Sequence, residues 1–129
     1  MTRRIRVSVL GFIAVVVLAS AVRIDAAADI TGTWTSSFDT QIGKQNYTYE
    51  LVAKGAALTG KIKSDNGASD VLEGKVDGDK VSFVELLKFQ DMDIRITYSG
   101  TVVSADEIKF TRQVGEFATE ELVSKRVKQ

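Results

Sequence analysis

Glu85 and Arg112 are the residues of this 129-residue chain whose types and positions most clearly offer chemistry. Each lies two residues from a phenylalanine, Phe83 or Phe110, in a segment where apolar and polar residues alternate. Because residues i and i+2 share one face of a strand, both charged side chains are predicted to turn inward. A carboxylate in an apolar cavity has a raised pKa, as a general acid requires. Three interpretations stay open: contact with a polar ligand, an internal ion pair, or a position near water at a barrel mouth.

The chain contains no histidine and no cysteine. This excludes a Ser-His-Asp triad, a cysteine protease dyad and a zinc site built from His or Cys. We therefore lean against an enzyme and expect no cofactor and no metal site. Asp77-Gly78-Asp79 and Asp91-Met92-Asp93 place oxygen ligands at alternate positions, which suits calcium. However, Asp beside Gly is ordinary turn chemistry, and neither run has the further oxygen donors of a calcium loop.

Aromatic residues with a polar tip form a second candidate group. Trp34 and the three tyrosines of the chain could offer a platform for a sugar ring or a flat apolar ligand, or they could simply be core. Core packing is the commoner role for such residues, and we favour it for Trp34 and for the tyrosines. Of the tyrosines, Tyr47 and Tyr49 are the two that best fit the lining of an opening. The candidate ligand-binding residues are therefore Tyr47, Tyr49, Glu85, Tyr98 and Arg112.

These side chains must be positioned by strands, because a motif of the form apolar-x-Gly-[Lys/Thr]-apolar occurs repeatedly. It is found at Ile30–Trp34, Leu58–Ile62, Leu72–Val76 and Tyr98–Val102. Apolar residues recur with period two after residue 28, and no window shows a helical period. The pattern predicts eight strands near Thr31–Phe38, Asn46–Ala53, Ala57–Ser64, Asp70–Val76, Lys80–Leu86, Asp91–Val102, Glu107–Val114 and Thr119–Val127.

The connections between these strands are too short to cross over a sheet. Asp77-Gly78 indicates a tight hairpin, since both residue types tolerate the positive φ of a two-residue turn. Sequential antiparallel pairing is the simplest topology, and eight such strands tend to close and so remove their edges. The predicted fold is an all-β, eight-stranded antiparallel up-and-down barrel. Its interior face is predicted to carry Trp34, Phe38, Tyr47, Tyr49, Leu51, Leu58, Ile62, Leu72, Val76, Val81, Phe83, Ile94, Ile96, Tyr98, Ile108, Phe110 and Leu122.

Residues 1–28 read as a cleaved signal peptide. A basic start at Arg3, Arg4 and Arg6 precedes the apolar run Val7–Leu18, which is shorter than the roughly 20 residues of a membrane span. Cleavage fits after Ala21 or after Ala28, and we favour Ala28 because the strand pattern follows at once. We therefore expect no stable membrane anchor, a secreted or periplasmic location, and one barrel domain over residues 29–129.

The net charge of the mature domain argues against a nucleic-acid partner. Four of the 17 basic and one of the 17 acidic residues lie in residues 1–28, which leaves 13 basic and 16 acidic, a net charge of −3. Neutralising phosphates requires a basic face, which a mildly acidic domain lacks. The domain also has no disulfide, so its stability must come from a continuous sheet and one apolar interior.

Gly32-Thr33-Trp34 on the first predicted strand resembles the Gly-x-Trp signature of lipocalin-like (calycin-type) barrels. The resemblance implies that an arginine of the last strand packs over the indole, and Arg126 occupies that place. Trp34 and Arg126 are then structural residues. The length is closer to barrels of the streptavidin or fatty-acid-binding kind. The chain is also similar to small exported bacterial domains that occur alone or at the ends of secreted hydrolases.

These observations favour a non-catalytic barrel that binds a small apolar, ring-shaped or sugar-like ligand in its mouth. A first alternative is a protein-interaction or accessory module associated with secreted hydrolases. Val84–Phe89 would be its docking segment, because it is too apolar for simple alternation and places hydrophobic residues on both faces. A binding barrel should bury that segment, whereas an adaptor should display it. A second alternative is a small hydrolase or isomerase that uses Glu85 or another carboxylate.

Overall fold

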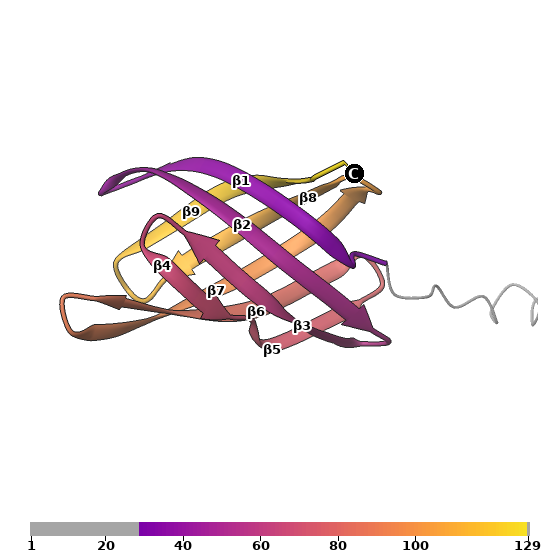
Figure 1. The fold of residues 1–129 in the computed structure, drawn as a ribbon, viewed down its shortest axis with the longest axis horizontal. Coiled ribbons are helices and arrows are strands. Elements are labelled where there is room, and N and C mark those ends of the chain that lie inside the picture. The colour runs from indigo at the N-terminus through magenta and orange to yellow at the C-terminus, as the bar shows by residue number, and fades with distance from the viewer. Residues whose placement is uncertain (1–28, 129) are drawn as a thin grey trace, which may run out of the picture.

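The strands of the computed structural model, which describes residues 29–128, form one antiparallel sheet that closes on itself (Figure 1). They are β1 (Gly32–Thr40), β2 (Gly43–Lys54), β3 (Ala57–Ser64), β4 (Gly67–Asp70), β5 (Leu72–Asp77), β6 (Lys80–Phe89), β7 (Met92–Ser104), β8 (Glu107–Val114) and β9 (Ala118–Arg126). No helix occurs between residues 29 and 128.

Closure follows the order of the strands in the chain. β1 pairs with β2 on one side and with β9 on the other, where Trp34 lies opposite Arg126. β4 and β5 share the outer edge of β3, so together they take the place of one strand in the ring. The predicted all-β, eight-stranded, up-and-down antiparallel barrel is therefore confirmed.

The predicted fourth strand, Asp70–Val76, is wrong as a single continuous strand. It is divided at Val71 into β4 and β5, and β5 carries a bulge between Leu72 and Lys75, where Glu73 has a φ of 51°. A bulge adds one residue to one side of a pair and shifts the alternation. As a result Val71 belongs to the core, and Leu72, which we expected there, is only half-buried.

The remaining interior positions follow the period-two pattern closely. Ile30 also joins the core, and Ile94 packs against its edge rather than inside it. Stacked and edge-on aromatic rings fill the middle of the barrel: Phe83 stacks on Tyr98 with ring centres 4.3 Å apart, and Tyr47 stacks on Tyr49 at 5.6 Å. Side chains therefore close the lumen at mid-height.

The two ends of the barrel differ. The turns β1–β2, β3–β4, β6–β7 and β8–β9 lie at one end, on the left of Figure 1, which we call the mouth. The N-terminal residues of the barrel and the end of β9 lie at the other, where Trp34 Nε1 donates to the Ile30 carbonyl oxygen at 2.9 Å. Arg126 covers Trp34 there and donates to the carbonyl oxygens of Thr31, Asp29 and Ala105. This end is closed.

The Gly-x-Trp pattern has a steric reason at this closed end. A Cβ on Gly32 would lie 2.7 Å from Nη1 of Arg126, and the φ of Gly32 is +146°. Glycine therefore leaves the space that the guanidinium occupies above Trp34.

Among residues 29–128 there is no helix of the length and apolar character that crossing a membrane requires. The predicted signal peptide, residues 1–28, lies outside the described residues.

Candidate functional site

The mouth opens into a cavity of about 290 Å³. Its wall is mostly apolar and comes from several strands and turns: Ile42, Leu87, Phe89, Met92, Ile94, Val114 and Phe117. Its polar lining includes Gln45, Tyr47, Arg112 and Glu120. Small-molecule sites usually combine such an apolar wall with a few fixed polar groups.

Period-two alternation explains which residues reach this cavity. Leu87 and Phe89 follow Phe83 and Glu85 on the inward face of β6, and Val114 follows Arg112 on β8. The strands continue beyond the packed aromatic layer, so their last inward residues surround open space instead of core.

The apolar segment Val84–Phe89 is accordingly divided between two environments. Leu87 and Phe89 line the cavity, whereas Leu86 lies on the opposite face of β6 and is 41% exposed. Val84 is only 4% exposed. The segment is the second half of β6.

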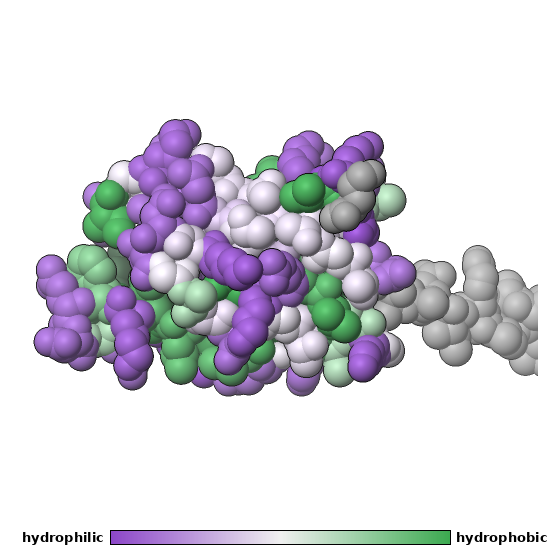
Figure 2. Space-filling model, in the orientation of Figure 1, coloured by the Kyte–Doolittle hydropathy of each residue, from purple (hydrophilic) through white to green (hydrophobic). Residues whose placement is uncertain are grey.

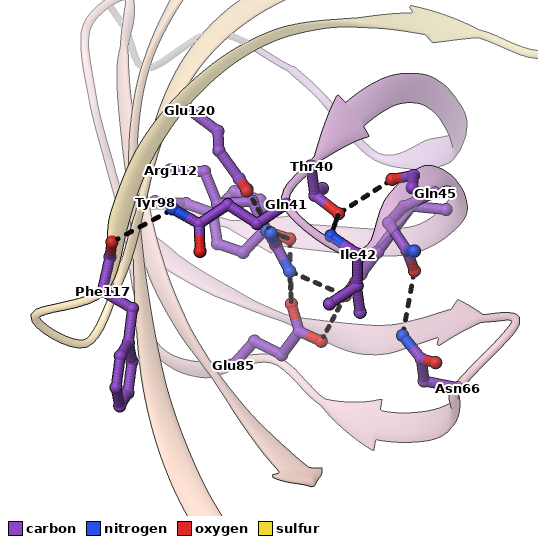
Figure 3. Close-up of polar contacts among 12 residues, drawn as sticks. Thr40, Gln41, Ile42, Gln45, Asn66, Glu85, Tyr98, Arg112, Phe117 and Glu120 are labelled. Atoms are coloured by element: carbon purple, nitrogen blue, oxygen red, sulfur yellow. Dashed lines mark hydrogen bonds and ion pairs between the residues drawn. The ribbon is translucent and has the colours of Figure 1, made fainter.

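Arg112 forms the floor of the cavity. Its Nε donates to Tyr98 Oη at 2.9 Å, its Nη2 donates to Tyr47 Oη at 2.7 Å, and its Nη1 is paired with Glu120. Figure 3 shows Arg112 between Glu120 and Glu85. The Arg112 guanidinium also lies 5.0 Å from the ring centre of Tyr47 and 5.2 Å from that of Phe38. A guanidinium held on all sides in this way is fixed in position.

Glu85 lies one layer deeper, with both carboxylate oxygens in use. Tyr98 Oη donates to Oε1 at 2.9 Å, and Tyr47 Oη donates to Oε2 at 3.1 Å. Its Oε1 lies 3.7 Å from Nη2 of Arg112. Burial raises the pKa of Glu85, while Arg112 and the two tyrosine hydroxyls act in the opposite direction. Burial also raises the pKa of Tyr47, Tyr49 and Tyr98, which remain hydroxyl donors at neutral pH.

The five candidate residues from the sequence thus converge in one hydrogen-bonded cluster. Tyr47 and Arg112 line the cavity, whereas Tyr49, Glu85 and Tyr98 lie beneath it and do not. Tyr49 donates to Tyr98 at 3.0 Å and is 1% exposed, so Tyr49 is core, and of the two tyrosines considered for an opening only Tyr47 lines it. Of the three open interpretations of Glu85 and Arg112, the structure contains the internal ion pair.

Sequence reasoning missed Glu120 and Gln45. Each was available from the same alternation, because Glu120 lies two residues before the core residue Leu122 and Gln45 two residues before Tyr47. Glu120 is the counter-ion of Arg112, and Gln45 accepts a hydrogen bond from Asn66 Nδ2 at 2.9 Å. Neither lies two residues from a phenylalanine, which is the signal that singles out Glu85 and Arg112.

No group of three or more acidic residues that could hold a metal ion occurs in the part of the chain that the structure describes. Gly78 and Asp79 form the β5–β6 turn, one residue later than the predicted Asp77-Gly78 pair, and Asp91 lies in the β6–β7 turn. Only Gly78 of the β5–β6 pair has a positive φ, 61°. A positive φ at the first turn residue is typical of a type II′ hairpin, which favours Gly at that place.

Comparison of the chain with protein-family models, with curated proteins and with solved structures finds no match.

Proposed function

We propose that this protein is an exported, non-catalytic barrel that binds one small, mainly apolar ligand in its mouth. The observation that carries the proposal is the cavity of about 290 Å³, apolar on its walls and polar at its floor. An apolar body would be desolvated against Leu87, Ile94 and Val114, while a polar group at one end would meet Arg112 and Glu120. Burial of apolar area supplies the affinity, and the fixed polar groups supply orientation.

The closed end supports a distant relationship to lipocalin-like barrels. Arg126 packs over Trp34, as the resemblance implies, with its guanidinium carbon 4.5 Å from the ring centre. We include calycin-type ancestry in the proposal for that reason.

The test compares two tryptophan substitutions on adjacent residues of β6. Leu87→Trp adds bulk inside the cavity, whereas Leu86→Trp adds the same bulk on the exposed outer face. The probe is prodan, a neutral naphthalene dye, titrated by its own fluorescence into the mature protein. Native mass spectrometry of gently purified protein reports any ligand that is already bound.

We expect the wild type and Leu86→Trp to bind prodan equally, and Leu87→Trp to bind it at least about tenfold more weakly, a difference of about 1.4 kcal/mol. Similar melting temperatures for both variants would show that the loss is local. Equal binding by the two variants, or no saturable binding by the wild type, would contradict the proposal.

A protein-docking role is the second candidate, favoured by exposed apolar side chains at the rim of the mouth. Ile42 is 58% exposed, Met92 50% and Phe117 61%. Figure 2 shows hydrophobic side chains at this end of the molecule, beside hydrophilic ones. A stoichiometric protein complex in the same native mass spectra, lost on Phe117→Ser and Met92→Ser, would favour this role. Catalysis gains no support, because both Glu85 oxygens are engaged and Glu85 does not line the cavity.

A further inference from the structure

We infer that the mouth cavity selects ligands whose polar group is neutral or cationic, and rejects those whose polar group is a carboxylate. This inference rests on the proposed function and names the ligand class of the same site. It follows from the charge and the unused hydrogen-bonding groups at the floor.

The floor has no positive charge to offer an anion. Arg112 faces two carboxylates, Glu85 and Glu120, and its side chain is 4% exposed. With both carboxylates ionised the cluster has a net charge of −1, and with one protonated it is neutral. A ligand carboxylate would add a further negative charge next to Glu120 in a poorly solvated space, where like charges repel strongly. To reach Arg112 it would have to displace Glu120.

Two polar atoms of the cavity lining have no hydrogen-bond partner among residues 29–128, and they indicate which polar groups of a ligand the cavity can accept. Among residues 29–128, Glu120 Oε2 receives no hydrogen bond, although the side chain is only 11% exposed and Oε1 is paired with Arg112. Gln45 is 8% exposed, and its Nε2 has no acceptor within that same part of the chain, since only its Oε1 is bonded. Buried polar groups normally have partners. An ammonium or a hydroxyl can donate to Glu120, whereas a carboxylate cannot.

The turns around the mouth add an independent acidic bias. Within two residues of these turns lie five acidic residues, Asp39, Asp65, Asp91, Asp93 and Glu116, and three basic ones, Lys44, Lys63 and Lys88. All three lysines are in ion pairs, Lys44 with Asp39 at 3.8 Å, Lys63 with Glu50 at 3.1 Å and Lys88 with Asp93 at 3.3 Å. An approaching cation therefore meets a favourable potential and an anion an unfavourable one, at low ionic strength above all.

The experiment compares ligands that share a similar apolar body and differ in their single polar group, which is an ammonium, a hydroxyl or a carboxylate. Isothermal titration calorimetry at neutral pH compares 2-naphthylmethylammonium, 2-naphthylmethanol and 2-naphthoate, and repeats the comparison with octylammonium, octanol and octanoate. The protein is the mature domain in three forms: wild type, Glu120→Gln and Glu121→Gln. Glu121 is exposed and lies on the outer face of β9, so its substitution is the matched charge control.

We expect the wild type to bind the ammonium and the alcohol at least about tenfold more tightly than the carboxylate. Glu120→Gln should reduce the ratio of ammonium to carboxylate affinity about tenfold, whereas Glu121→Gln should leave it unchanged. Tighter binding of the carboxylate than of the ammonium by the wild type overturns the inference, whether or not Glu120→Gln folds. If no member of either series binds, the proposed function itself fails.

Discussion

The guanidinium carbon of Arg126 lies 4.5 Å from the centre of the Trp34 ring, at the end of the barrel opposite the mouth. The two residues are also paired in register between β9 and β1, so the contact lies on the seam where the first strand meets the last. The same pair therefore joins the first strand to the last and covers the closed end of the barrel. The cavity, at the other end, is separated from this pair by the packed aromatic layer.

Arg126→Ala is expected to reduce stability by about 2–6 kcal/mol without changing ligand affinity. The substitution removes a cation–π contact of about 0.5–2 kcal/mol and hydrogen bonds of about 0.5–1.5 kcal/mol each to three backbone carbonyls. Urea unfolding measures the loss, and prodan titration measures the affinity. Lys128→Ala is the control, because it removes only an exposed ion pair with Asp106. Loss of affinity with stability unchanged would instead make Arg126 a ligand contact.

Glu85→Gln is expected to change how stability depends on pH. Burial raises the pKa of Glu85 in the folded protein above its ordinary value of 4.5, so the folded state holds this proton more tightly than the unfolded state. The wild type must then lose stability relative to Glu85→Gln as pH rises from 4.5 through the raised pKa, by up to about 1.4 kcal/mol per pH unit.

Urea unfolding of both proteins between about pH 4 and about pH 8 checks this sign. Glu50→Gln, on the exposed face of β2, controls for a general charge effect. A wild type that gains stability relative to Glu85→Gln with rising pH would show that Arg112 and the tyrosines outweigh the burial of the carboxylate.

Arg112→Met is expected to destabilise the protein by about 3–5 kcal/mol, because it leaves two largely buried carboxylates without their counter-ion. Addition of Glu85→Leu should restore part of this loss by removing one of those charges. Arg95→Met is the matched control, since its partner Glu73 and Arg95 itself are exposed, and it should change stability little. Equal effects of Arg112→Met and Arg95→Met in urea unfolding would contradict the assigned role of the cluster.

Gly100→Ala is expected to reduce stability by about 1–3 kcal/mol through overpacking. A Cβ at this position would lie 2.5 Å from Cδ1 of Phe110, which packs over the bare backbone of the fourth repeat motif. Phe110→Leu in the Gly100→Ala background should recover part of the loss, because the smaller side chain vacates that space. Thermal melting of the single and double variants measures it, and Ser99→Ala, on the exposed neighbouring position, should change little.

The strands and most of the core were predictable because they depend on local alternation. From Trp34 to Leu122, period two alone indicates which side of a strand meets water, whatever the partner strand is. The prediction failed at Leu72, because the strand is irregular at a bulge there and Val71 is in the core instead of Leu72. A bulge depends on how two strands pair, and no pattern within one strand reveals it.

The sequence also determined that Glu85, Arg112 and Tyr47 point inward, since each belongs to the apolar face of its strand. It did not determine where they lie along the barrel axis, because alternation indicates only the face of the strand on which a residue lies. Only the closed tertiary structure places Tyr49 and Tyr98 in the packed aromatic layer beneath the cavity and Arg112 at the cavity floor. The curvature and stagger of the ring decide which inward residues from distant strands meet. They bring Glu120 to Arg112 and leave space above both.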